Sequence, residues 1–148
     1  MTDLEIQEIE SKKRYLKRYR KNRALIDRLN DKIEILDERI KGIRSPRFSD
    51  MPRGGTPITK EDMIAEKDDI QRRIDRLEVK GKIIKGEILD IIDELDDTRY
   101  AEILEAFLID CKDFGEIAED NCYSVRHIER LYSEAIKSVV GLMSEICR

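Results

Sequence analysis

Residues 124 to 130, SVRHIER, place a hydroxyl, two guanidinium groups, an imidazole and a carboxylate within a short stretch of one predicted helix. Arginine donors suit phosphates and guanine edges, and a serine at a helix start can hold a phosphate together with the free N–H groups there. Arg126 and Arg130 are four residues apart, so they project from nearby faces and can divide base and phosphate contacts between them. This pattern favours recognition of DNA. The candidate contact residues are Ser124, Val125, Arg126, His127, Glu129 and Arg130.

The same residue types offer little for catalysis or metal binding. His127 is the only histidine, and no Ser/His/Asp set or carboxylate pair with a pocket can be argued from the sequence. A zinc site would have to combine His127 with Cys111, Cys122 and Cys147, and that spacing matches no standard site. We therefore expect reduced structural cysteines, no cofactor, no metal and no enzymatic activity.

A second concentration of positive charge lies near the start of the chain. Residues 12–28 carry nine Lys or Arg against one Asp, although the net charge of the whole chain is −4. We expect internal ion pairs to balance most of this segment, with some phosphate contact by Arg18, Arg20 or Arg23. The alternative is that the whole basic segment tracks phosphates and the last helix only selects the sequence.

These residues must be positioned by helices, because 42% of the chain is charged and only 5% is aromatic. A first arm is predicted over residues 3–43, with seam residues spaced alternately by four and three. Its seam is Tyr15, Tyr19, Asn22, Ile26, Leu29, Ile33, Leu36, Ile40 and Ile43. The polar member, Asn22, is of the kind that fixes register or partner number. Leu16 lies on a different phase, which makes the seam less regular near the start.

A second arm is predicted over residues 59–96, with Thr59 as its N-terminal cap. Its seam is Ile70, Ile74, Leu77, Gly81, Ile84, Ile88, Ile91 and Leu95. Gly81 would let a neighbouring helix come close. Residues 44–58 contain all three prolines and a Gly pair, so they form a hinge through which a helix cannot continue.

The hinge is long enough for the arms to fold back as an antiparallel hairpin, and it equally permits each arm to pair with another chain. Because seams this narrow leave little core within one chain, we expect a homo-oligomer formed through coiled coils. The alternative is a monomeric helical hairpin packed on the last domain.

The last domain, residues 97–148, is predicted to contain a helix-turn-helix. Asp97 or Thr98 caps a helix that runs to about Asp110, Asp113 caps a short helix, and Ser124 caps the last one. Ala118 is small where two helices must cross, and Ile117, Ile128 and Leu131 are expected to clamp them together. Tyr123 is expected to plug the core below the turn, and Asn121 to take the left-handed conformation that ends the short helix.

The approach to this motif is strongly acidic. Residues 87–121 hold thirteen Asp or Glu and only two Lys or Arg, whereas four Lys or Arg face three Glu from Cys122 onward. We therefore expect the acidic helices to sit behind or beside a DNA-facing last helix. The sequence predicts an all-α protein with two coiled-coil-like arms over residues 1–96, joined by a Pro/Gly hinge at residues 44–58. A helix-turn-helix DNA-binding domain follows over residues 97–148.

The string YSVRHIERLYSEAI after FGEIAE resembles the C-terminal signature of phage transcriptional regulators of the RinA/ArpU type. The resemblance extends to a charged helical N-terminal half, the linker SPRFSDMPRGGTP, a second helical arm and the step from Leu95 to Tyr100. Tails of this family are similar to region four of bacterial sigma factors. The resemblance implies a recognition helix over Ser124–Lys137, which adds Lys137 to the candidate DNA contacts.

What the resemblance implies is a sequence-specific activator of phage late genes that binds double-stranded DNA and also touches host RNA polymerase. We expect it in the cytoplasm of the bacterial host, because no stretch approaches a secretory segment or a membrane span. Two alternatives stay open: a DNA-packaging adaptor similar to a small terminase subunit, and a coiled-coil scaffold that does not bind DNA.

Overall fold

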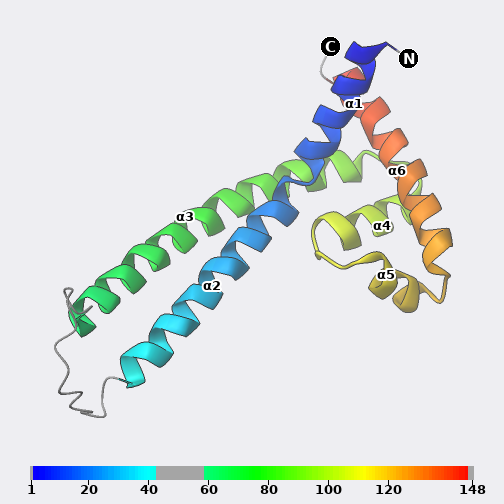
Figure 1. The fold of residues 1–148 in the computed structure, drawn as a ribbon. Helices are drawn as coiled ribbons and strands as arrows, with labels where there is room; N and C mark the ends of the chain where they lie inside the picture. The colour runs from blue at the N-terminus through cyan, green and yellow to red at the C-terminus, as the bar shows by residue number, and fades with distance from the viewer. Residues whose placement is uncertain (1, 43–58, 147–148) are drawn as a thin grey trace. The chain divides into compact units, whose positions relative to one another are not determined.

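The computed structural model describes residues 2–42 and 59–146, and every regular element in these two ranges is an α-helix (Figure 1). The predicted all-α fold is confirmed. The predicted hinge at residues 44–58 lies outside the described residues, as do Ile43 and Cys147. In chain order the helices are α1 (Asp3–Leu16), α2 (Arg18–Gly42), α3 (Lys60–Asp93), α4 (Thr98–Leu108), α5 (Phe114–Asn121) and α6 (Val125–Ile146).

The helices form two compact units. The first comprises Met1–Arg23 and Lys80–Arg148, and the second comprises Ala24–Val79. The sequence-based boundary between residues 96 and 97 lies inside the first unit. The reason is that one end of each arm contributes side chains to the same core as the C-terminal helices.

In the second unit, α2 and α3 run antiparallel and bury their seams against each other (Figure 1). Each aliphatic side chain buried in this way stabilises the fold by roughly 1.5–3 kcal/mol. Lys67 and Asp37 form an ion pair across the two helices at 2.5 Å. The hairpin alternative is therefore the one observed within the chain, and the homo-oligomer stays a prediction. The buried residues are Ile26, Leu29, Leu36, Ile70 and Ile74.

The first arm is not one continuous helix as predicted, because it is interrupted at Lys17 between α1 and α2. Helix α1 begins with a capping box, in which Thr2 and Glu5 exchange side-chain to backbone hydrogen bonds. It ends at Leu16, whose side chain is completely buried in the core of the first unit. The break lets Leu16 reach that core although it lies off the seam that Tyr19 and Asn22 follow.

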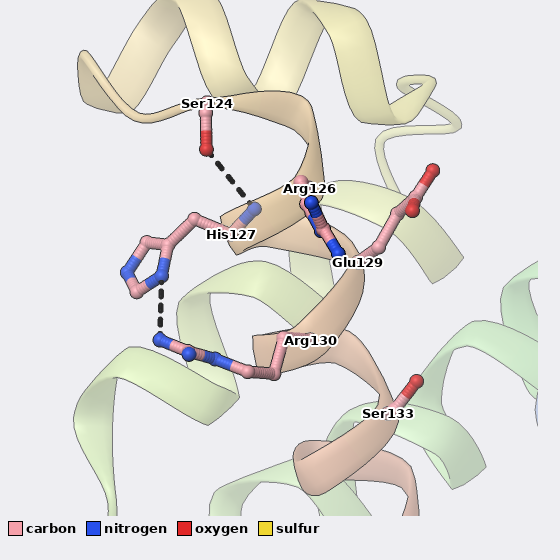
Figure 2. A pocket seen from close by; sticks show the side chains of 6 residues that line it. All are labelled: Ser124, Arg126, His127, Glu129, Arg130 and Ser133. Carbon is pink, nitrogen blue, oxygen red and sulfur yellow. Dashed lines mark hydrogen bonds between the residues drawn. The ribbon is translucent and has the colours of Figure 1, made fainter.

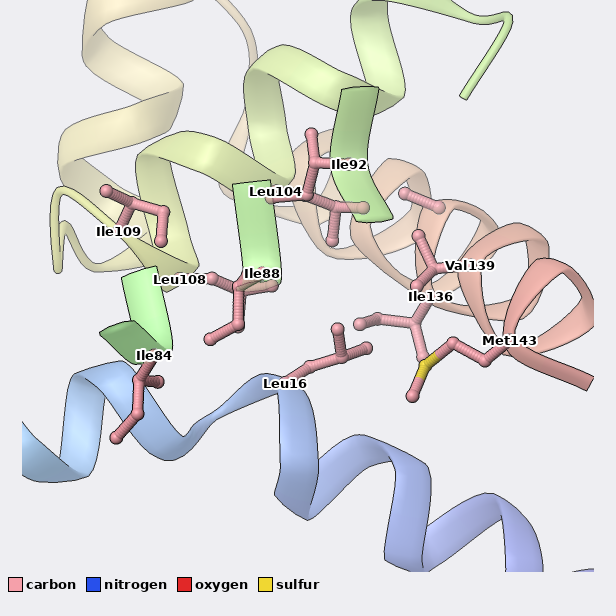
Figure 3. Packing of buried hydrophobic residues seen from close by; sticks show 11 residues of the cluster. Leu16, Ile84, Ile88, Ile92, Leu104, Leu108, Ile109, Ile136, Val139 and Met143 are labelled. Carbon is pink, nitrogen blue, oxygen red and sulfur yellow. The ribbon is translucent and has the colours of Figure 1, made fainter. Parts of the chain in front are cut away.

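The core of the first unit draws on α1, α3, α4 and α6 (Figure 3). On α3 the buried positions step by four residues, through Ile84, Ile88 and Ile92. The predicted seam instead continued to Ile91, which is only partly buried. The spacing of buried residues changes from alternating four and three to four because this end of α3 packs against α4 and α6 as well as against the first arm. The core is formed by Leu16, Ile84, Ile88, Ile92, Leu104, Leu108, Ile109, Ala135, Ile136, Val139 and Met143.

Asn22 and Gly81 mark the point where α2 approaches α3 closely in the first unit. A Cβ atom added at Gly81 would lie 2.6 Å from the Asn22 Oδ1 atom, and Asn22 is only 5% exposed. The expectation that a small seam residue admits a neighbouring helix is confirmed at this position. The predicted cap at Thr59 is also confirmed, because its Oγ1 atom accepts a hydrogen bond from the Asp62 N–H at 3.1 Å.

Candidate nucleic-acid interface

Helices α5 and α6 are joined by a short turn that the backbone closes tightly. Asp113 caps α5 as predicted, accepting a hydrogen bond from the Glu116 N–H at 2.8 Å. The left-handed residue after α5 is Cys122, with φ of 57° and ψ of 37°. The prediction that Asn121 takes this conformation is wrong, because Asn121 is the last helical residue and its amide donates to the Ile117 carbonyl.

A separate apolar cluster holds the two helices of the turn together. Ile117 and Ile128 are completely buried, and Ala118 is 4% exposed where α5 and α6 cross. Leu131 and Ile103 complete the cluster, so the predicted clamp is confirmed and α4 contributes to it. Because side chains of three helices interlock here, the start of α6 is held rigidly beneath its exposed face.

An aromatic group lies beside this cluster. The Phe107 and Phe114 rings stack with centroids 4.9 Å apart, and the Tyr132 ring lies 4.7 Å from the first and 5.1 Å from the second. Burial raises the pKa of Tyr132 to about 12. This group anchors the middle of α6 to α4 and to the start of α5.

Ser124 caps α6 as predicted, because its Oγ atom accepts a hydrogen bond from the His127 N–H at 3.2 Å. The serine hydroxyl keeps its own hydrogen for donation to another acceptor. The N–H groups of the first helical turn lack partners inside a helix and point outward from its N-terminus. The start of α6 thus has the chemistry that an anionic oxygen requires.

Tyr123 does not plug the core as predicted, because 45% of its surface is exposed. Its ring instead meets the His127 ring edge-on, with centroids 4.8 Å apart. The left-handed Cys122 turns the chain outward just before Tyr123, while Ile128 fills the space beneath the turn. Tyr123 and His127 therefore belong to the outer surface of the turn.

The outward face of α6 forms a shallow concave surface of about 570 Å³. Figure 2 shows that Arg130 and His127 project to one side of the helix and Glu129 to the other. The Arg130 guanidinium lies 3.0 Å from the His127 Nδ1 atom, which accepts its hydrogen when the imidazole proton is on Nε2. The surface is lined by Ser124, Arg126, His127, Glu129, Arg130 and Ser133.

The structure therefore brings together five of the seven predicted contact residues of the last helix. Val125 is 44% exposed at the start of α6, beside that surface but not lining it. Lys137 lies further along the helix and lines a different groove, between α1 and α6. Sequence reasoning missed Ser133, although its spacing of three from Arg130 and seven from Arg126 is a helical signal that could have found it.

The candidate phosphate contacts of the first arm are engaged inside the chain. Arg18 forms an ion pair with Glu87 at 2.6 Å, and its guanidinium lies 3.8 Å from the centre of the Tyr15 ring. Hydrogen bonds from Arg18 and then Tyr15 lower the pKa of Glu87. Arg23 also takes part in an interaction within the chain.

Arg20 donates hydrogen bonds to two backbone carbonyls and also contacts an aromatic ring. Its Nη1 atom donates to the Phe107 carbonyl at 2.8 Å and to the Lys112 carbonyl at 3.0 Å. The guanidinium also lies 4.0 Å above the Phe107 ring. Arg20 therefore joins the first arm to the segment between α4 and α5, and it satisfies a carbonyl at the end of α4 that no intrahelical N–H can reach.

Comparisons with protein-family models, with curated proteins and with solved structures found no match. Within residues 2–42 and 59–146, no helix has the length and apolar character needed to cross a bilayer. Over the same ranges, no three His, Cys, Asp or Glu side chains are grouped so that they could hold a metal ion.

Proposed function

We propose that this protein is a sequence-specific DNA-binding transcription regulator whose reading element is the N-terminal part of α6. The observation that carries the proposal is the pairing of two faces on one helix segment. The inner face, with Ile128 and Leu131, is fixed in an apolar cluster, while the outer face presents Arg126, Glu129 and Arg130 to solvent. A rigid helix with exposed donors and acceptors suits the major groove of DNA.

Each exposed group has a matching partner on a duplex. Arg126 and Arg130 have the forked donors that pair with the two acceptors of guanine, and Glu129 can accept from the amino group of cytosine. The Ser124 hydroxyl and the first N–H groups of α6 suit a backbone phosphate. The hydrogen bond between Arg130 and His127 restrains the guanidinium before DNA arrives, which reduces the entropy lost on binding.

The acidic charge of the chain is compatible with this proposal because much of it lies in residues 87–121, which precede α6. Acidic side chains that precede α6 have partners within the chain: Asp120 pairs with Lys112 at 2.8 Å, and Asp113 accepts from the Glu116 N–H at 2.8 Å. The net charge of −4 weakens attraction to any duplex. A regulator of this kind must then derive more of its affinity from the particular contacts made by α6.

Activation of phage late genes and contact with host RNA polymerase are part of the proposal, and the sequence resemblance supports them. A homo-oligomer is also part of it. Large apolar side chains on the arm helices of the second unit are exposed after the seams have paired, which leaves apolar surface for another copy. They are Leu25, Ile35, Ile64 and Val79.

The proposal is tested by selecting bound duplexes from a random-sequence pool and then titrating the selected duplex by fluorescence anisotropy. We expect the Arg126→Ala/Arg130→Ala variant to lose about 1–3 kcal/mol of binding free energy for each arginine that reads a base, and to lose selectivity over scrambled DNA. The matched control is Arg72→Ala/Arg76→Ala, an exposed pair with the same spacing on α3.

Two outcomes would contradict the proposal. One is a selection that enriches no sequence, and the other is a selected duplex that the α6 variant and the α3 control bind equally well. Light scattering of the same samples tests the oligomer. A ring-sized assembly with unselective DNA binding would point to a packaging adaptor, and absence of DNA binding at low salt would point to a scaffold.

A further inference from the structure

A groove of about 630 Å³ runs between α1 and α6 in the first unit. Its floor is aliphatic, with Ile6, Ile136 and Val140 among the lining residues. Three lysines also line it: Lys13 from α1, Lys17 from the break that follows α1, and Lys137 from α6. An aliphatic surface beneath lysines lets their stems lie along it while their ammonium groups remain in water.

This groove continues the proposed reading surface along the same helix. Ser133 lines both the groove and the concave surface that holds Arg126 and Arg130. From Arg126 the spacing to Arg130, Ser133 and Lys137 is four, three and four residues, so all four side chains share one face of α6. That face covers about 16 Å of helix axis, roughly half of one turn of a DNA duplex.

The continuous surface is positively charged although the whole chain is negative. Its lining residues include five Lys or Arg and two Glu, Glu10 and Glu129. Glu10 lies 3.7 Å from the Lys13 ammonium, and both side chains of this pair are more than a third exposed, so the pair is weak. Among the residues that the structure describes, Lys17 and Lys137 form no ion pair.

We propose that the α1–α6 groove is a second DNA-contacting surface, in which Lys13, Lys17 and Lys137 bind backbone phosphates that flank the sequence read by the start of α6. The inference rests on the proposed function. Its occupant is the sugar-phosphate backbone of a duplex, because the charge of the groove is opposite and because the groove is continuous with the reading surface. A phosphate contact of this kind adds affinity but no sequence preference.

This assignment differs from the arginines that the sequence suggested for the same task. Arg18 and Arg20 use their guanidinium groups on Glu87 and on two backbone carbonyls. Lys13 and Lys17 precede both arginines in the chain and line the groove. The basic segment is thus divided between arginines of α2 that act within the chain and two lysines, Lys13 on α1 and Lys17 just after it, that face DNA.

The test is the salt dependence of DNA binding by the Lys13→Ala/Lys17→Ala variant of the full chain. The slope of log K against log salt concentration is negative, and each lost phosphate contact makes it shallower by about 0.9. We therefore expect the slope of this variant to be shallower by about 1.8. Binding to the selected duplex and to scrambled DNA should weaken by the same factor. Lys13→Arg/Lys17→Arg keeps both charges and should retain the wild-type slope.

The matched control is Lys82→Ala/Lys85→Ala, which removes two exposed lysines from α3 in the same unit. This change should leave the slope as it is, and circular dichroism should show equal helix content in all variants. The inference is overturned if the Lys13→Ala/Lys17→Ala variant keeps the wild-type slope, or if the α3 control makes the slope shallower by the same amount.

The two proposals fail in different ways. If Arg126→Ala/Arg130→Ala removes selectivity while the Lys13→Ala/Lys17→Ala variant binds like the wild type, the proposed reading function stands. The proposal that the α1–α6 groove binds phosphates then fails. That outcome would assign the aliphatic, lysine-rimmed groove to an acidic protein segment instead. If no variant or wild-type protein selects a sequence, the proposed function itself fails.

Discussion

The arginines of α2 and the arginines of α6 are the same residue type used in opposite ways. Arg20 lies over the Phe107 ring and donates to two backbone carbonyls, and Arg18 is held by Glu87 and Tyr15. Arg126 and Arg130 lie on an exposed face. Within the described residues, the hydrogen-bond partner of Arg130 is the neighbouring His127 imidazole. Local charge density therefore does not reveal which cations remain available to a partner.

Whether an arginine remains available to a partner depends on what surrounds its guanidinium. Helix α2 lies where carbonyls at the end of α4 and a carboxylate on α3 require donors, so its arginines stabilise the fold. Among the residues that the structure describes, the start of α6 faces no such groups, because its inner side is occupied by Ile128 and its outer side by solvent. Substitutions in the first set should change stability, and those in the second should change binding.

Arg20→Ala should have the largest effect on stability. It removes two hydrogen bonds from a charged donor and the contact with the Phe107 ring, so we expect the free energy of unfolding to fall by about 2–3 kcal/mol. Urea denaturation measures this loss. Lys21→Ala, the exposed neighbour, and Arg126→Ala should each stay within about 0.5 kcal/mol of wild type. Equal losses in Arg20→Ala and Arg126→Ala would remove the distinction between the two sets.

Gly81→Ala should have the next largest effect, because it acts on the close approach that brings α2 to α3. The added methyl group would collide with the buried Asn22 side chain, and we expect a loss of about 1–2 kcal/mol. Gly86→Ala on the same helix has open space and should instead gain about 0.5–1 kcal/mol. Thermal unfolding of the pair checks this, and two changes of the same sign would contradict the close approach.

Cys122→Gly should stabilise the protein by about 0.5–1 kcal/mol, because a glycine adopts the left-handed conformation of this position more readily. The matched control is Cys122→Ala, which keeps a Cβ atom and should give no such gain. Because the turn keeps its shape, DNA binding by the glycine variant should equal that of wild type. A glycine variant no more stable than the alanine variant would refute the role of the left-handed cap.

Glu87→Gln should have the smallest effect, and it should depend on pH. The folded protein lowers the pKa of Glu87 from its ordinary value of 4.5, chiefly through the hydrogen bond from Arg18. The stabilisation is therefore present above pH 4.5 and is lost as the pH falls through the lowered value. We expect the variant to melt below wild type at neutral pH and to converge with it in acid. Glu78→Gln, another exposed carboxylate of α3, is the control, and a gap that persists in acid would contradict this account.

Much of the fold could be predicted because helix seams and caps depend on local sequence. The seam from Ile26 to Leu36 and the caps at Thr59, Asp113 and Ser124 follow from residue spacing and side-chain chemistry. The break at Lys17 and the phase change to Ile92 could not be predicted in this way. They arise because the arm ends pack with α4 and α6, and that contact joins residues far apart in the chain.

The candidate interface likewise has features that local sequence predicts and features that depend on residues far apart in the chain. The exposed start of α6 could be read from a cap followed by polar residues at helical spacing. The internal role of Arg20 could not, because its partners are carbonyls about ninety residues away that carry no sequence signal. Tyr123 was misjudged because an aromatic residue in a turn can face either side, and the left-handed Cys122 decides which.

DNA should meet the arginines of α6 and not those of α2. Arginine-selective chemical labelling, read by mass spectrometry, can follow both sets in one experiment. In the free protein, Arg126 and Arg130 should react quickly, while Arg18 and Arg20 react slowly. Saturation with the selected duplex should protect Arg126 and Arg130 and leave the other two unchanged. The account would be contradicted if the duplex left Arg126 and Arg130 fully reactive, or if Arg20 reacted as fast as Arg126 before DNA was added.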